Sequence, residues 1–252
     1  MGQRLLGRGE LEQLAMTRGM SIATRSYIAA VSLVALIAAA LLWRNGAPAA
    51  GVTAFLLVAG LGALAHAYPI QGFRHQAYQV TLPFIVIAAA MFSAAQLVAF
   101  IILIHLAEQA RVRRRPSIQW FNVCNYLISA AIAALLFHRA AQLLLPDGAL
   151  GQLIDATAAA SVFILVNRVL LTGVLWLARG LSPLASGLFQ PEMLAADLVI
   201  AWIAGPMLVV AVAAGTWTVL FTAGPLLFAR TALTSLIRRR QESPSRTQAR
   251  AA

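Results

Sequence analysis

The sequence feature that most constrains this chain is an apolar run at residues 82–109, followed by an arginine cluster at residues 111–115. As one α-helix, the run would be about 42 Å long at 1.5 Å per residue, well beyond the roughly 30 Å hydrocarbon core of a bilayer. The alternative is two shorter segments, about 82–92 and 95–110, separated by a break near Ser93. The first of these is short for a full crossing, so we expect it to be re-entrant or shielded by neighbouring helices.

The distribution of arginine decides between one crossing and two. All 19 basic residues are arginine, and the cytoplasmic loops of membrane proteins carry the excess of positive charge. With a cytoplasmic N-terminus and two crossings, 15 arginines fall inside and two, Arg44 and Arg139, fall outside. With one crossing, the split becomes 6 inside against 11 outside. We therefore predict a hairpin that returns the chain to the cytoplasm. The arginines predicted inside are Arg4, Arg8, Arg18, Arg25, Arg74, Arg111, Arg113, Arg114, Arg115, Arg179, Arg238, Arg239, Arg240, Arg246 and Arg250.

Composition extends this membrane assignment to the whole chain. Hydrophobic residues make up 61% of the sequence and charged residues 11%, whereas ordinary globular domains carry about a quarter charged residues. We predict an all-α polytopic membrane bundle of about eight segments over residues 27–237, with both termini cytoplasmic and the lipid bilayer as its surroundings. Residues 1–26 form a cytoplasmic leader, either an interfacial amphipathic helix or a solvated segment. Residues 238–252 form a disordered, Arg-rich tail. The predicted segments are 27–43, 49–67, 82–92, 95–110, 119–144, 153–178, 193–214 and 217–236.

Several function classes lack their sequence signatures. The chain contains no Gly-x-Ser-x-Gly, His-Glu-x-x-His, P-loop or Gly-rich dinucleotide motif, so we predict no catalytic activity and no cofactor. Its one cysteine, Cys124, excludes an intramolecular disulfide. The arginines flank apolar spans, where they set orientation, and we predict no nucleic-acid partner.

His105 and Glu108 lie three residues apart and therefore share one face of a helix. A His-x-x-Glu pair can bind metal in helical bundles when further carboxylates come from other helices. No second Glu-x-x-His motif is present, so we predict no metal site. The simpler interpretation is a pair near the cytoplasmic boundary that is solvated or bonded to arginine.

Other polar residues are predicted at the same depth. Asn122 and Asn125 share a helix face one turn into their span, where interhelical hydrogen bonds contribute about 0.6 to 2 kcal/mol. With Asp197, Arg230 and the His105–Glu108 pair, they fall in the predicted cytoplasmic halves of their spans. They form either a structural network or a ligand pocket, in which Glu108 or Asp197 would neutralise Arg230.

Asn167 and Arg168 fall near the middle of their span. An unpaired arginine at that depth costs at least about 2.5 kcal/mol on insertion scales, so Arg168 must face protein, water or a partner. It either pairs structurally or binds an anionic ligand. The ligand-binding candidates are Asn122, Asn125, Asn167, Arg168, Arg230, His105 and Glu108.

Three stretches carry a resemblance to a known type of bacterial membrane module. They read LPFIVIAAAMF…HLAEQARVRRRPSIQWFNVCNYLISAAIAALLFHRA, SVFILVNRVLLTGVLWLARG and GPLLFARTAL. The chain resembles, over about residues 50–237, the N-terminal membrane regions found ahead of HD-GYP phosphohydrolase or GGDEF diguanylate cyclase output domains. Those proteins continue into a catalytic domain, and this sequence stops about 15 residues after its last predicted helix. The positions that match the module pattern are Phe121, Asn122, Tyr126, Asn167, Pro225 and Arg230.

The resemblance implies a bacterial cytoplasmic (inner) membrane protein with a sensory or scaffolding role. We expect the bundle to sense a small or lipid ligand and to act on a separate cytoplasmic or membrane partner protein through its Arg-rich face. One alternative is a small transporter or substrate-binding component with an anion-binding cavity at Asn167 and Arg168. Another is a structural subunit of a larger complex.

Overall fold

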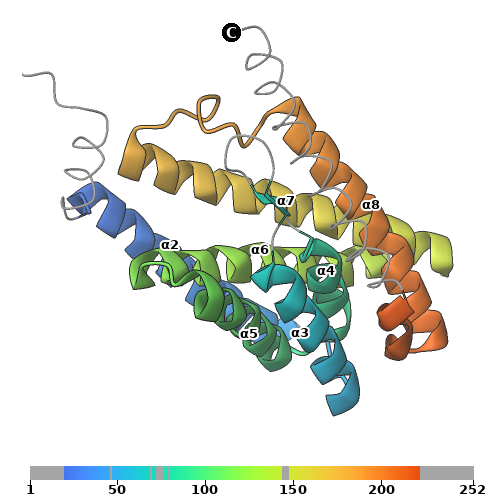
Figure 1. Cartoon of the computed structure of the whole chain (residues 1–252). Coiled ribbons are helices and arrows are strands. Elements are labelled where there is room, and N and C mark those ends of the chain that lie inside the picture. The colour runs from blue at the N-terminus through green and yellow to red at the C-terminus, as the bar shows by residue number, and fades with distance from the viewer. Residues whose placement is uncertain are drawn as a thin grey trace, which may run out of the picture.

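The computed structural model describes residues 20–45, 47–68, 70–71, 77–78, 80–143 and 148–221, and this part of the chain is a bundle of α-helices (Figure 1). Two-residue strands β1 (Ile70–Gln71) and β2 (Ala77–Tyr78) form one antiparallel pair, and η2 (Thr216–Thr218) is a 3₁₀ turn. The predicted all-α class is confirmed apart from this short strand pair. The helices are α2 (Ile22–Asn45), α3 (Val52–Ala67), α4 (Leu82–Met91), α5 (Ala94–Val112), α6 (Pro116–Leu143), α7 (Ala149–Arg179) and α8 (Pro191–Ala214).

Five of these helices, α2, α5, α6, α7 and α8, are long and apolar enough to cross a membrane, and α3 and α4 are apolar but shorter. The outer surface carries large exposed apolar side chains, such as Leu33 and Leu36 of α2 and Trp202 of α8, which suits contact with lipid. By helix length and composition, the described part is a multi-pass membrane bundle. Most of the predicted last span, 217–236, lies outside the described residues. So do most of the leader, 1–26, and all of the tail, 238–252.

The predicted break near Ser93 is confirmed. Helix α4 ends at Met91 and α5 begins at Ala94. Ser93 is the N-cap of α5: its Oγ accepts from the Gln96 backbone N–H at 3.4 Å, and Gln96 Oε1 accepts from the Ser93 N–H at 3.1 Å. This reciprocal capping box satisfies backbone donors at the start of a helix. The Gln96 amide also bonds to both backbone groups of Ala50, at 2.9 and 2.7 Å, and so holds the start of α5 beside the start of α3.

Helix α4 runs opposite to α3 and α5. Thr81, which precedes α4, contacts His66 at the end of α3, and Phe92, which follows α4, packs its ring 5.4 Å from that of Phe55 near the start of α3. The predicted reversal of chain direction between the segments 82–92 and 95–110 is therefore confirmed.

The shielding predicted for the short segment is confirmed as well. Residues 82–89 are all buried, and α4 packs against α3, α5, α6, α7 and α8. A helix of 10 residues spans only about 15 Å, and its ends are tolerated at membrane depth because protein and not lipid surrounds them.

The later helices continue to alternate in direction. Each of α6, α7 and α8 packs antiparallel to the helix before it, and α2 begins beside the start of α6 and the end of α7. Tyr27 of α2 donates a hydrogen bond to the Leu170 carbonyl of α7 at 3.0 Å, and Trp120 of α6 donates to Ser32 of α2 at 2.8 Å. The contacts that fix the other directions join Gln119 with His105, Asn125 with Asn167, and Arg168 with Asp197.

Alternation gathers six of the nine described arginines at one end of the bundle. We call it the basic end: the starts of α2, α4, α6 and α8 and the ends of α3, α5 and α7. Arg44 and Arg139 belong to the opposite end, as predicted. The arginines at the basic end are Arg25, Arg111, Arg113, Arg114, Arg115 and Arg179, whereas Arg4, Arg8, Arg18, Arg74 and those of the tail lie outside the described residues.

Close packing of α3 on α5 depends on one of its glycines. The sequence indicates Gly51, Gly60 and Gly62 as positions for close helix contact. A Cβ at Gly62 would lie 2.7 Å from the Phe100 ring, whereas Cβ atoms at Gly51 and Gly60 would meet nothing within 4 Å. The prediction is confirmed for Gly62 and wrong for the other two, because those face away from the neighbouring helices.

Candidate functional site: a histidine–glutamate cluster

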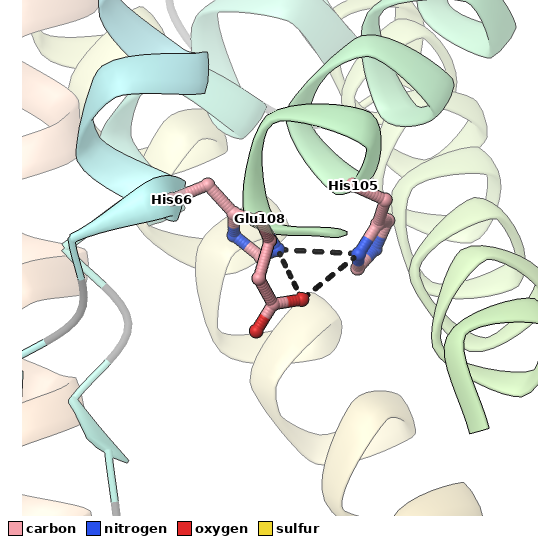
Figure 2. Close-up of side chains that lie close together, drawn as sticks. All are labelled: His66, His105 and Glu108. Atoms are coloured by element: carbon pink, nitrogen blue, oxygen red, sulfur yellow. Dashed lines mark hydrogen bonds and ion pairs between the residues drawn. The ribbon is translucent and has the colours of Figure 1, made fainter. Parts of the chain in front are cut away.

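A cluster of three side chains joins α3 to α5 at the basic end. His105 and Glu108 project from one face of α5, and His66 reaches them from the last turn of α3 (Figure 2). His66 Nε2 lies 3.2 Å from His105 Nδ1. Glu108 Oε2 lies 3.6 Å from each of these nitrogen atoms. Two imidazole nitrogens and one carboxylate oxygen thus face one another as a small triangle, which we call the His66–His105–Glu108 cluster.

The cluster is buried, with exposed fractions of 9% for His66, 1% for His105 and 6% for Glu108. The Tyr126 ring of α6 packs edge-on against both imidazoles, with centroid distances of 5.2 and 4.6 Å. The far nitrogen of His66, Nδ1, lies 3.2 Å from Thr81 Oγ1. These contacts fix both rings in orientation, as rotation of either would break an aromatic or polar contact.

The second oxygen of Glu108 faces the basic turn after α5. Glu108 Oε1 accepts hydrogen bonds from Arg114 Nε at 3.1 Å and Nη2 at 2.9 Å. Arg113, the C-cap of α5, adopts the left-handed conformation with φ of 52°, and this turns the chain so that the Arg114 side chain reaches back to Glu108. Arg114 is 40% exposed at its side chain. One carboxylate therefore connects two buried imidazoles to a surface arginine.

The sequence prediction for this pair is correct in part. Glu108 is bonded to an arginine, as the simpler interpretation expected, but the pair is buried and not solvated. His66 was missing from the predicted site. Its only sequence signal is a histidine in the last turn of the apolar segment 49–67, and its proximity to His105 follows from α3 and α5 packing side by side in the same direction.

The Arg168 guanidinium forms a second buried group. Its Nε donates to Asp197 Oδ2 of α8 at 2.8 Å, its Nη2 donates to the same oxygen, and Nη2 lies 3.5 Å from the Met193 carbonyl oxygen. Both residues are 6% exposed. Arg168 is thus paired structurally with Asp197. Arg230, for which Asp197 was predicted as a counterion, lies outside the described residues. A neutralised arginine weakens the case for the anion-binding cavity that a transporter would need.

Of the three predicted amide residues, Asn125 and Asn167 contact each other next to this pair, and Asn122 does not join them. Asn125 of α6 donates to the Asn167 carbonyl of α7 at 3.3 Å, which is the interhelical hydrogen bond expected for Asn125. Asn122 is half-buried, and within the described ranges no polar contact joins it to either group. The polar contacts therefore sort the predicted residues into the His66–His105–Glu108 cluster, an Asn125–Asn167 hydrogen bond and an Arg168–Asp197 pair. The last two adjoin because Asn167 and Arg168 are consecutive in α7.

The first of these groups has the chemistry of a metal centre. Imidazole nitrogen and carboxylate oxygen are the usual protein ligands of zinc and related transition metals. Within the part of the chain that the structure describes, this is the group of histidine, cysteine and acidic side chains whose ligand atoms converge. We therefore take it as the candidate functional site. Comparison of the chain with protein-family models, with curated proteins and with solved structures finds no match.

Proposed function

We propose that this chain is a sensory membrane domain of the bacterial cytoplasmic membrane that has no catalytic activity and reports on the state of its buried cluster through the basic end. The positive-inside rule supports a cytoplasmic basic end, because six described arginine positions lie there and two lie opposite. A last span at 217–236 would return the chain to the basic end and give eight segments with both termini cytoplasmic. The resemblance to sensor-type modules supports the same role.

The observation that carries the proposal is the shared carboxylate of Glu108. Its Oε2 faces the imidazoles of His66 and His105, and its Oε1 holds Arg114. A ligand that drew on the negative charge of Glu108 would weaken its hold on Arg114, because charge-assisted hydrogen bonds depend on that charge. The cluster and the basic turn are therefore coupled through one side chain.

The coupling suggests how a signal would leave the membrane. With Glu108 free of ligand, Arg114 is held back against the bundle and the turn at residues 113–115 is fixed. With Glu108 engaged by a ligand, the Arg114 guanidinium is released to solvent or to an acidic surface on a partner protein. The two states differ in which group the carboxylate contacts, which is the differential interaction that any ligand-driven shift requires.

A spin label beside the basic turn tests this coupling. Val112 ends α5 and is 44% exposed, so Val112→Cys can be labelled once the buried Cys124 is replaced by Ala. In the full chain in nanodiscs, Glu108→Gln and Arg114→Gln should each increase the mobility of the label. Asp197→Asn, which disturbs the other polar group, should leave it unchanged. Equal mobility in the parent protein and in both cluster variants would contradict the proposed relay.

A further inference from the structure

We propose that His66, His105 and Glu108 bind a divalent transition-metal ion of the zinc class. The binding of this ion is argued from geometry and donor chemistry alone. The further claim that the ion is the sensed signal rests on the proposed function. The three residues come from two helices that are packed side by side, so the site is built on rigid elements and not on loops.

The three ligand atoms are already spaced as a metal would hold them. Tetrahedral coordination at about 2.0 to 2.2 Å places neighbouring ligand atoms about 3.3 to 3.6 Å apart. The observed separations are 3.2, 3.6 and 3.6 Å. A point just off the plane of this triangle lies about 2.1 Å from all three atoms, which matches zinc–nitrogen and zinc–oxygen bond lengths in a tetrahedral site. An ion could therefore bind without movement of either helix.

The donor set selects the class of ion. Two of the three donors are imidazole nitrogens, which suit zinc, copper, nickel and iron, whereas magnesium and calcium take oxygen ligands almost exclusively. Of these metals, zinc has no geometric preference from its d electrons and accepts tetrahedral sites with three protein ligands. The fourth position is left to water or a small anion.

Neighbouring groups support the ligands in the required state. A metal bound at His66 Nε2 leaves the Nδ1 proton to be donated to Thr81 Oγ1, 3.2 Å away, and such outer hydrogen bonds orient metal-binding histidines. Gln119 Nε2 donates to the His105 carbonyl at 2.7 Å and steadies the turn of α5 that carries His105. His105 would be ligated through Nδ1, because that nitrogen faces His66 and Glu108, and its Nε2 has no hydrogen-bond partner within the described part of the chain.

Metal titration of the full chain tests the proposal. The protein is purified in detergent through a tag that contains no histidine, treated with chelator, and titrated with Zn²⁺ against a chromophoric competitor. We expect one Zn²⁺ per chain, no binding of Mg²⁺, and a loss in affinity of about 100-fold or more in His66→Gln, His105→Gln and Glu108→Gln, since loss of even an outer-sphere partner costs about 10- to 100-fold. His138→Gln, which removes a histidine of α6 away from the cluster, should bind as the parent does.

A spectroscopic measurement covers the case in which the variants fail to fold. X-ray absorption of the zinc-loaded parent protein should give two imidazole ligands and oxygen ligands at about 2.0 Å. Absence of stoichiometric zinc binding, or a zinc site with no imidazole, would overturn the proposal. Unaltered affinity in all three cluster variants would do the same.

The two proposals can fail separately. Zinc binding without a change in the mobility of the label at residue 112 leaves the metal site standing and refutes the sensory relay. A label that responds to Glu108→Gln in a protein that binds no zinc refutes the metal site and leaves the relay standing.

Discussion

Replacing Asp197 by Asn isolates the role of the buried Arg168–Asp197 pair. The pair is held by two hydrogen bonds to one carboxylate oxygen, and the side chains are only 7% and 9% exposed. Removal of one partner from a buried ion pair typically costs about 3 to 5 kcal/mol, because the other charge is left uncompensated. Asn keeps one acceptor oxygen for the guanidinium, so we expect a loss of about 3 kcal/mol, a change of about 150-fold in the unfolding equilibrium.

The assay is equilibrium unfolding of the purified chain in mixed detergent micelles, followed by circular dichroism. Asp155→Asn is the matched control, because Asp155 of α7 is also buried, at 5% exposure, but its Oδ1 has no hydrogen-bond partner in the described ranges. It should cost less than about 1 kcal/mol, since no paired charge is orphaned. The double variant Arg168→Met with Asp197→Leu should return to within about 1 kcal/mol of the parent, because apolar replacement of a whole buried pair is often neutral.

Two results would refute this reasoning. One is an Asp197→Asn variant as stable as Asp155→Asn, which would mean that Arg168 finds other compensation. The other is a double variant less stable than either single variant, which would mean that the pair contributes more than mutual neutralisation.

Three further predictions concern helix packing and use the same unfolding assay. Gly62→Ala should cost about 1 to 3 kcal/mol, because its Cβ would lie 2.7 Å from an aromatic ring of α5, whereas Gly60→Ala should be neutral or stabilising in its open surroundings; equal effects would contradict the packing of α3 on α5. Gln96→Leu should cost about 1 to 3 kcal/mol, because it removes both hydrogen bonds to Ala50 and half of the capping box; unchanged stability would show that the cap does not hold α5 to α3. Tyr27→Phe should cost about 0.5 to 1.5 kcal/mol through loss of its hydrogen bond to a carbonyl of α7, and a loss above that range would indicate a larger role for the hydroxyl.

The hairpin was predictable from the sequence because two independent constraints agree on it. The run at 82–109 is too long for one crossing. The arginines of the chain also gather on one side of the membrane only if this run crosses it twice. Ser93 with Gln96 three residues later is a capping box that can be recognised from residue types alone.

The composition of the site was only half predictable. His105 and Glu108 lie on one helix, so their spacing places them on one face. His66 is 39 residues from His105, and no local pattern indicates that α3 and α5 lie side by side in parallel. That arrangement depends on α4 running back between their ends and on the close approach at Gly62.

The partner of Arg168 was not predictable for a similar reason. The sequence offered Asp197 as a counterion to Arg230, because depth within a span was the only guide to proximity. Which residues of α7 and α8 meet depends on the path of the connection at 180–190, and a shift of one helical turn would separate Arg168 from Asp197. Burial of an arginine required some partner, but its identity came only from the packed structure.

Site-directed cysteine labelling in intact cells measures most directly which way the bundle is oriented. Single cysteines at Val112 and Ser182, at the basic end, and at Ala49, at the opposite end, are introduced in the Cys124→Ala background; all three positions are exposed. A membrane-impermeant maleimide should label Ala49→Cys in intact spheroplasts and should label Val112→Cys and Ser182→Cys only after the membrane is opened. Two results would contradict a cytoplasmic basic end and the sensory role built on it. One is labelling of both residue 112 and residue 182 from outside, and the other is labelling that places these two residues on opposite sides of the membrane.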